Sequence, residues 1–228
     1  MRPIIAGRLD DMPPQVRLGL GAFRYEVFVK RLCWQLPDAD AAGAIEWDRF
    51  DRTDTVHVVS LDAAGQICGC ARLMPTTKPY LLQTLQAHAS NLALPCCPSV
   101  WELSRFAARP SQNPSTDSLP GMQFFPSILA IAATLGASRV IGAVSYAIAR
   151  LYRRFGLELH TIATTGHTRA SGYLVCAIDL SAQTLQNLGY DASALMRTVM
   201  WVGQGPMAPT PASTADSAVP HHQGHTTI

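Results

Sequence analysis

The sequence predicts an α/β protein with a mixed, mostly antiparallel sheet flanked by helices. Stretches of helical periodicity alternate with short strand-like runs, and residues 55–60 and 66–73 form a β-hairpin around the turn at 62–65. The 228 residues are enough for one generous domain or two small ones, and no internal repeat divides them. With 48% hydrophobic and 15% charged residues, the composition is typical of a compact globular protein.

The first predicted helix covers residues 15–32 and follows a pair of prolines. Its core-facing side chains recur at helical spacing and are Leu20, Phe23 and Val27. Arg24 and Phe28 lie on an adjoining stripe together with Arg31. For an isolated helix, the simplest interpretation makes Phe28 additional core and Arg24 a solvated flank.

Residues 46–54 form an acidic loop with interleaved arginines. Its carboxylates have the chemistry to hold a cation, but no glycine occupies the centre as in a calcium loop. Turn formation and exposed ion pairs are the alternative. Arg72, near the end of the hairpin, lies among residues that the sheet would bury, so it needs a carboxylate partner. Asp48 or Asp51 would serve.

Residues 100–106, Val-Trp-Glu-Leu-Ser-Arg-Phe, alternate apolar and polar side chains as a half-buried strand does. Glu102 and Ser104 then share one face, whereas Arg105 shares the other with Trp101 and Leu103. A regular strand cannot direct Glu102 and Arg105 to one site. If both serve the same site, the strand must bulge at or just after Ser104.

The second half continues the alternation of helices and strands. Expected strands are 139–145, 158–164 and 173–179, and expected helices are 126–135, 146–155, 182–188 (capped by Ser181) and 192–202, with a short helix or loop at 84–93 and a mobile loop at 107–121. The helix at 146–155 carries three arginines on one face, which suits either solvent or an acidic partner. We expect one folded domain over 1–202 and a disordered tail over 203–228, rich in Pro, Ala, Ser, Thr and His.

Several classes of function are disfavoured. The net charge of +2 gives no sign of nucleic-acid binding. No apolar run approaches the roughly 20 residues of a membrane span, and the N-terminus lacks a signal-peptide core, so we expect a soluble, cytoplasmic protein. The six cysteines lack the spacing of a metal site, and we expect thiols and no bound metal. Signature motifs of nucleotide-binding and α/β-hydrolase enzymes are absent from the sequence.

Four segments together resemble the acyl-homoserine-lactone synthases, the bacterial autoinducer synthase family. They are Arg24-x-x-x-Phe28 with Trp34, Glu46-x-Asp48-x-Phe50-Asp51, Arg72 within Cys70-Ala-Arg-Leu-Met-Pro-Thr-Thr77, and Trp101-Glu-Leu-Ser-Arg-Phe106. The resemblance implies an N-acetyltransferase-like fold whose central strands splay into a cleft. It also implies quorum-sensing signal synthesis, in which the amine of S-adenosylmethionine is acylated from acyl carrier protein. Lactonisation then releases an acyl-homoserine lactone and methylthioadenosine.

The resemblance also implies functions for particular residues. Glu102 is the candidate general base, beside Ser104 and Arg105, and backbone N–H groups after Ser104 would bind the oxyanion. The expected S-adenosylmethionine site comprises Arg24, Phe28, Trp34, Asp48, Asp51, Arg72 and Phe106. The expected acyl pocket comprises Met122, Phe125, Leu129, Gly142, Val144 and Ile148, and the carrier protein would dock on Arg150, Arg153 and Arg154. Gly142 stands where many members that prefer 3-oxo chains have threonine, which favours an unsubstituted chain.

Two alternatives differ in function but keep the fold. One is an acetyl-CoA-dependent N-acetyltransferase, although no Q/R-x-x-G-x-G/A turn for the pyrophosphate occurs at 107–121. The other is a binding module that senses a ligand without catalysis. The expected partners of the synthase are acyl carrier protein and S-adenosylmethionine, which is a substrate, with no cofactor, and we expect the enzyme to be a monomer.

Overall fold

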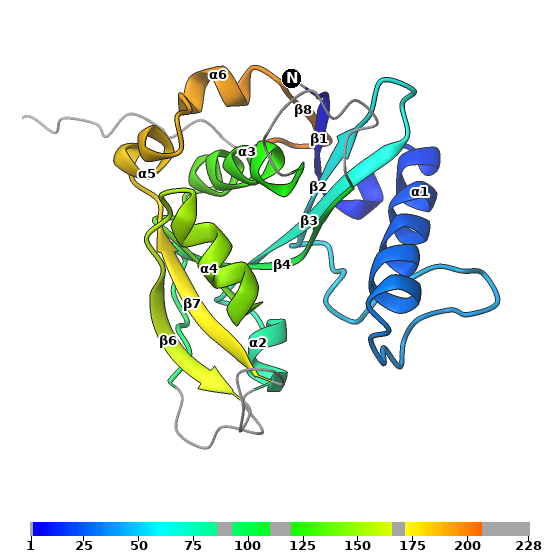
Figure 1. Cartoon of the computed structure of the whole chain (residues 1–228). Helices are drawn as coiled ribbons and strands as arrows, with labels where there is room; N and C mark the ends of the chain where they lie inside the picture. Colours follow the sequence, from blue (N-terminus) through cyan, green and yellow to red (C-terminus); the bar gives the residue numbers. More distant parts are fainter. Residues whose placement is uncertain (1, 86–92, 110–119, 166–171, 207–228) are drawn as a thin grey trace, which may run out of the picture.

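A computed structural model describes the chain except for residues 1, 86–92, 110–119, 166–171 and 207–228. Its centre is a sheet of eight strands in the order β6-β7-β5-β4-β3-β2-β1-β8 (Figure 1). The strands are β1 Ile4–Gly7, β2 Val56–Leu61, β3 Ile67–Pro75, β4 Val100–Ala108, β5 Arg139–Ser145, β6 His160–Thr165, β7 Tyr173–Asp179 and β8 Val199–Val202. Because only β4–β5 and β1–β8 pair in parallel, the expectation of a mixed, mostly antiparallel sheet is confirmed.

Helices cover both faces of the sheet (Figure 1). They are η1 Leu9–Asp11, α1 Pro14–Arg24, η2 Tyr25–Arg31, α2 Leu81–Leu85, α3 Pro120–Thr134, α4 Tyr146–Arg154, α5 Ala182–Asn187 and α6 Ala192–Met196. The largest core joins α3 to the sheet and to the helices that follow it, whereas α1 closes a second core on the opposite face. A third, smaller core lies beneath α2. None of the described helices combines the length and apolarity needed to cross a bilayer.

The first helix changes its winding before the site. It runs as α1 to Arg24 and then as the π-helix η2, in which the N–H of Leu32 reaches the carbonyl of Val27. Such wide turns often occur at functional sites because they redirect side chains that a regular helix would place elsewhere. Arg24 and Phe28 are both buried, at 1% exposure each. The interpretation of Arg24 as a solvated flank is therefore wrong.

The predicted distortion of β4 is confirmed. Ser104 pairs with Arg72 and Ala107 with Cys70, so β4 carries one residue more than β3 in this interval. Arg105 lies there with a positive φ of 50°. On its other edge, β4 pairs with β5 only from Val100 to Glu102, after which the two strands separate. A bulge and a splay thus meet at the same point of the sheet.

The two ends of the domain differ most from expectation. The helix predicted over 192–202 is wrong in its second half, because α6 ends at Met196 and residues 199–202 form β8. This strand pairs in parallel with β1, which periodicity did not predict. Helix α3 begins six residues before the predicted start, at Pro120. Most of the predicted mobile loop, much of the segment at 84–93 and nearly all of the tail lie outside the described residues.

Candidate active site

A closed ring of alternating charges lies between the end of α1, the acidic loop and the strands β3 and β4. Each carboxylate in it bridges two arginines, in the order Arg24, Glu46, Arg105, Asp48, Arg72, Asp51 and back to Arg24. The Nη2 atom of Arg105 donates to Glu46 Oε1 at 2.9 Å and to Asp48 Oδ2 at 2.8 Å. With three cations and three anions, the ring is balanced in charge. The predicted pairing of Asp48 and Asp51 with arginines is confirmed.

Burial makes the ring a strongly coupled unit. Asp51, at 3% side-chain exposure, receives two hydrogen bonds from Arg24, at 2.8 and 3.1 Å, and one from Arg72 at 2.9 Å. Although burial alone would raise the pKa of Asp51, the charges of Arg24 and Arg72 hold it well below its ordinary value. Burial is also the main reason that the pKa of His57, beside Asp51, falls to about 3. His57 is therefore neutral and leaves the charge balance unchanged.

Glu102 belongs to β4, and its side chain is buried at 1% exposure. Its Oε1 accepts the backbone N–H of Leu82 at 3.1 Å, whereas its Oε2 has no partner among the described residues. Burial raises the pKa of this carboxyl to about 7, an effect that the charge of Arg72 partly opposes. A carboxyl with this pKa is suited to exchanging a proton near neutral pH. Glu102 is not among the residues that line the large cavity described below.

Aromatic side chains cover the open side of the ring. Phe28 and Trp34 stack with their centroids 4.9 Å apart, and the Arg105 guanidinium lies 5.5 Å from the first ring and 5.8 Å from the second. Trp34 is 44% exposed, so it keeps surface available to a ligand. Stacked aromatic faces next to fixed charges favour a flat or cationic ligand.

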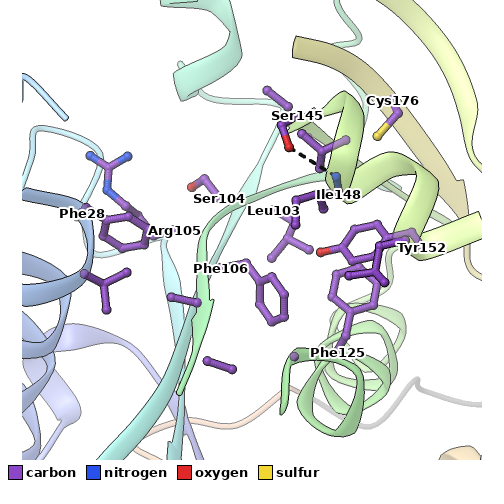
Figure 2. Close-up of a pocket in the computed structure, with 18 of the residues that line it drawn as sticks. Phe28, Leu103, Ser104, Arg105, Phe106, Phe125, Ser145, Ile148, Tyr152 and Cys176 are labelled. Carbon is purple, nitrogen blue, oxygen red and sulfur yellow. Dashed lines mark hydrogen bonds between the residues drawn. The ribbon is translucent and has the colours of Figure 1, made fainter. Parts of the chain in front are cut away.

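An apolar cavity of about 580 Å³ opens where β4 and β5 separate (Figure 2). Its walls come from η2, β4, α3, β5, α4 and β7. Of the predicted site residues it gathers Phe28, Trp34, Ser104, Arg105, Phe106, Met122, Phe125, Gly142, Val144 and Ile148. The size and the mostly hydrophobic lining are typical of a small-molecule site. Ser104 and Arg105 belong both to this lining and to the contacts of the ring.

The position expected for Leu129 needs correction, whereas the function expected of Phe106 stays a prediction. Leu129 does not line the cavity but packs in the main core at 1% exposure, because it lies one helical turn beyond Phe125 on α3. Phe106, grouped with the S-adenosylmethionine site, packs against Phe124 and Phe125 of α3, with centroids 6.1 and 5.2 Å away. The bulge at Arg105 places Phe106 among the residues expected around the acyl chain.

Helix α4 presents an exposed basic face beside the cavity. Arg150, Arg153 and Arg154, which we call the α4 arginine face, are exposed and form no ion pair within the described part of the chain. The opposite side of the same helix lines the cavity through Ile148, Leu151 and Tyr152. A partner bound to the basic face would therefore lie next to the cavity.

Sequence reasoning missed three residues of the site. Glu46 lies in the family pattern, but its sequence context indicates no function for it, although it joins two arginines of the ring. His57 follows the regular alternation of a strand, which gives no sign that it lies against Asp51. Tyr152 lies at helical spacing from Ile148, and that spacing alone could have placed it on the cavity wall.

Comparisons with known proteins agree with this geometry. Residues 18–188 match the autoinducer synthase family. An acyl-homoserine-lactone synthase from Ralstonia nicotianae is 40% identical over 190 residues, covering 81% of this chain and 92% of the relative. The crystal structure of TofI in a ternary complex with an inhibitor and MTA is 38% identical, has a TM-score of 0.68, and is matched over 85% of this chain and 99% of that chain.

The fold likeness extends further. An acyl-CoA N-acyltransferase from Pseudomonas aeruginosa has a TM-score of 0.50 at 16% identity, covering 78% of this chain and 99% of that chain. This confirms the N-acetyltransferase-like fold. The match over most of the domain, at 40% identity to a named relative, goes beyond the fold. The chain therefore belongs to the autoinducer synthase family and is an acyltransferase of the acyl-homoserine-lactone synthase type.

Proposed function

We propose that this enzyme transfers an acyl group from acyl carrier protein to the amine of S-adenosylmethionine and then closes the lactone. The products are an N-acyl-homoserine lactone and 5′-methylthioadenosine. The observation that carries the proposal is the bulge at Arg105, where an apolar cavity and an aromatic, charged compartment meet on one strand. One compartment suits an acyl chain and the other suits a charged nucleoside.

The sulfonium substrate would lie against Trp34, whose ring is partly exposed at the cavity. Every carboxylate of the ring already bridges two arginines. We therefore assign the ring mainly to holding the shape of the site. Asp48, with 11% of its side chain exposed, is the ring carboxylate with most surface left for a substrate. Support from relatives includes the presence of MTA in the TofI complex.

Glu102 would remove the proton from the attacking amine. An α-amino group has a pKa of roughly 8, so it is largely protonated at neutral pH and must lose a proton before it can attack. The pKa of Glu102, about 7, suits this transfer. Because Glu102 does not line the cavity, we propose that the proton passes through one water to the unpaired Oε2.

The amine nitrogen would then attack the thioester carbonyl, forming the amide bond and releasing the carrier thiol. Backbone N–H groups near the bulge are candidates to bind the developing oxyanion, since β4 beyond Glu102 does not pair with β5. In the second step the methionyl carboxylate attacks its own γ-carbon. The carbon–sulfur bond breaks, and its electron pair neutralises the sulfonium as 5′-methylthioadenosine leaves.

We propose acyl carrier protein as the acyl donor because of the surface beside the cavity. Acyl carrier proteins are acidic, and the α4 arginine face lies beside the cavity without internal partners in the described chain. An acetyl-CoA-dependent N-acetyltransferase would need only a small acyl pocket, so the cavity of about 580 Å³ favours a longer chain. The complete charge ring and the unpaired oxygen of Glu102 favour catalysis over a sensing module.

One assay separates these possibilities. The purified protein is incubated with S-adenosylmethionine and a panel of acyl carrier protein thioesters, with acyl-CoA and acetyl-CoA in parallel. Mass spectrometry follows methylthioadenosine and lactone together. The proposal predicts equal amounts of the two products with long-chain carrier thioesters. Absence of both with every donor would refute the synthase, and acetylation of simple amines from acetyl-CoA would establish the alternative enzyme.

A further inference from the structure

The lining of the apolar cavity contains a phenol hydroxyl that the proposed mechanism does not use. Tyr152 on α4 lines the cavity and is 5% exposed. No hydrogen bond to its hydroxyl is found among the described residues, and this oxygen is not one of the fully enclosed polar atoms without a partner, so it keeps surface open to the cavity. The other two hydroxyls in the lining are engaged, since Ser104 accepts from Arg72 Nε at 3.0 Å and Ser145 accepts from the N–H of Ile148 at 3.3 Å.

The surroundings of Tyr152 fix where this hydroxyl points. Its ring packs on Phe125 with a centroid distance of 4.7 Å, and Cys176 lies on the neighbouring wall. Figure 2 shows the hydroxyl directed across the cavity, toward Leu103 and Phe106. Burial raises the pKa of Tyr152, so the phenol stays protonated and can act as a donor at any physiological pH.

The energetic consequence depends on the ligand. A plain alkyl chain would displace water from the cavity and leave the phenol unpaired, which costs about 1–3 kcal/mol. A chain that carries a carbonyl or hydroxyl oxygen at this depth would accept the hydrogen bond instead. Sites with a buried polar group discriminate strongly against analogues that cannot pair with it.

We propose that Tyr152 is a specificity-determining residue that selects acyl chains bearing an oxygen substituent, keto or hydroxy, by donating a hydrogen bond to that oxygen. The inference rests on the proposed function, because it names the acyl class for the same cavity. It differs from the expectation drawn from Gly142, which looked for the partner of the oxygen on β5. The structure offers a donor on α4, across the cavity.

The test compares 3-oxo, 3-hydroxy and unsubstituted acyl carrier protein thioesters of equal chain length. Wild-type enzyme should show the higher kcat/KM with an oxygenated chain. Tyr152→Phe removes one oxygen atom and keeps the ring that packs on Phe125. It should lower kcat/KM for the preferred oxygenated chain by about tenfold, equivalent to one hydrogen bond, while turnover of the unsubstituted chain is kept or improved.

Tyr146→Phe is the matched control, since Tyr146 lies on the same helix but does not line the cavity. It should leave the preference unchanged. Wild-type preference for unsubstituted chains, or an unchanged preference in Tyr152→Phe, would overturn the inference while leaving the synthase reaction established. If no thioester is turned over by the wild type, the proposed function fails and the inference fails with it.

Discussion

Replacing Glu102 with glutamine separates the catalytic function of this carboxyl from its effect on stability. The substitution keeps an oxygen to accept the Leu82 N–H but removes the basic site. We expect turnover to be lost, because the amine nucleophile would have no group to take its proton. Wild-type kcat/KM should rise as pH passes through about 7, where Glu102 ionises, and this rise should be absent from the variant.

The stability effect has the opposite sign from that of a typical salt-bridged carboxyl. Burial raises the pKa of Glu102 from 4.5 to about 7, so the folded protein holds this proton more tightly than the unfolded chain. The associated stabilisation is present below pH 4.5 and is lost as pH rises through about 7. At 1.36 kcal/mol per pKa unit, the shift corresponds to about 3 kcal/mol. Glu102→Gln should therefore gain about 3 kcal/mol relative to wild type between pH 4.5 and pH 8.

Urea denaturation of both proteins at a series of pH values measures this difference directly. Glu158→Gln is the control, because Glu158 is exposed and its replacement should leave a gap that does not vary with pH. A constant gap between Glu102→Gln and wild type would refute the raised pKa. Full turnover by a folded Glu102→Gln would remove Glu102 as the base, whatever its pKa.

Three further experiments test the ring, the splay and the docking surface. Asp51→Asn leaves two buried arginines without their shared partner, so it should lower the free energy of unfolding measured by urea denaturation by about 3–5 kcal/mol. The control Asp54→Asn, in a half-exposed ion pair, should lower it by less than about 1 kcal/mol. Equal losses in the two variants would argue against a coupled ring. Gly142→Ala would place a Cβ 2.9 Å from the backbone oxygen of Leu103, so it should lower the free energy of unfolding by about 1–3 kcal/mol. No loss would show that β4 and β5 can separate further at this point. Charge reversal of the α4 arginine face should raise KM for acyl carrier protein thioesters by about tenfold or more at low salt and far less at high salt. The same change should leave KM for a pantetheine thioester, which has no carrier protein, unchanged. An equal effect on both donors would contradict docking.

Local patterns predicted the elements that depend on local chemistry. The bounds of β5 and the Ser181 cap of α5 are present as expected, because each is determined by residues within a few positions. Coverage of β5 on both faces, expected from its apolar run, holds only for Val140 and Ile141. β1 and β8 were missed because each has only four residues and is stabilised by strands far away in the sequence, β1 by β2 and β8, and β8 by β1. No window of sequence contains both partners.

In the site, too, features set by local sequence were predictable and features that need distant segments to meet were not. Charge and spacing predicted that Arg72 needs a carboxylate, and Asp48 and Asp51 are indeed its partners. The closure of the ring through Glu46 was not predictable, since it requires the end of α1, the acidic loop and β4 to converge. The side chain of Leu129 illustrates the limit of helical periodicity, which identifies the stripe that faces a cavity but not where along the helix the cavity ends.

The bulge at Arg105 links these features energetically. A non-glycine residue with φ near 50° is strained by roughly 1–2 kcal/mol, and the ion pairs of Arg105 with Glu46 and Asp48 hold it in place. The distortion turns Arg105 toward the ring and Phe106 toward α3, and it lies where β4 separates from β5. The ring therefore maintains the strand geometry that opens the cavity. Weakening one of its ion pairs should therefore reduce acyl transfer, because the bulge would lose part of what holds Arg105 at its positive φ.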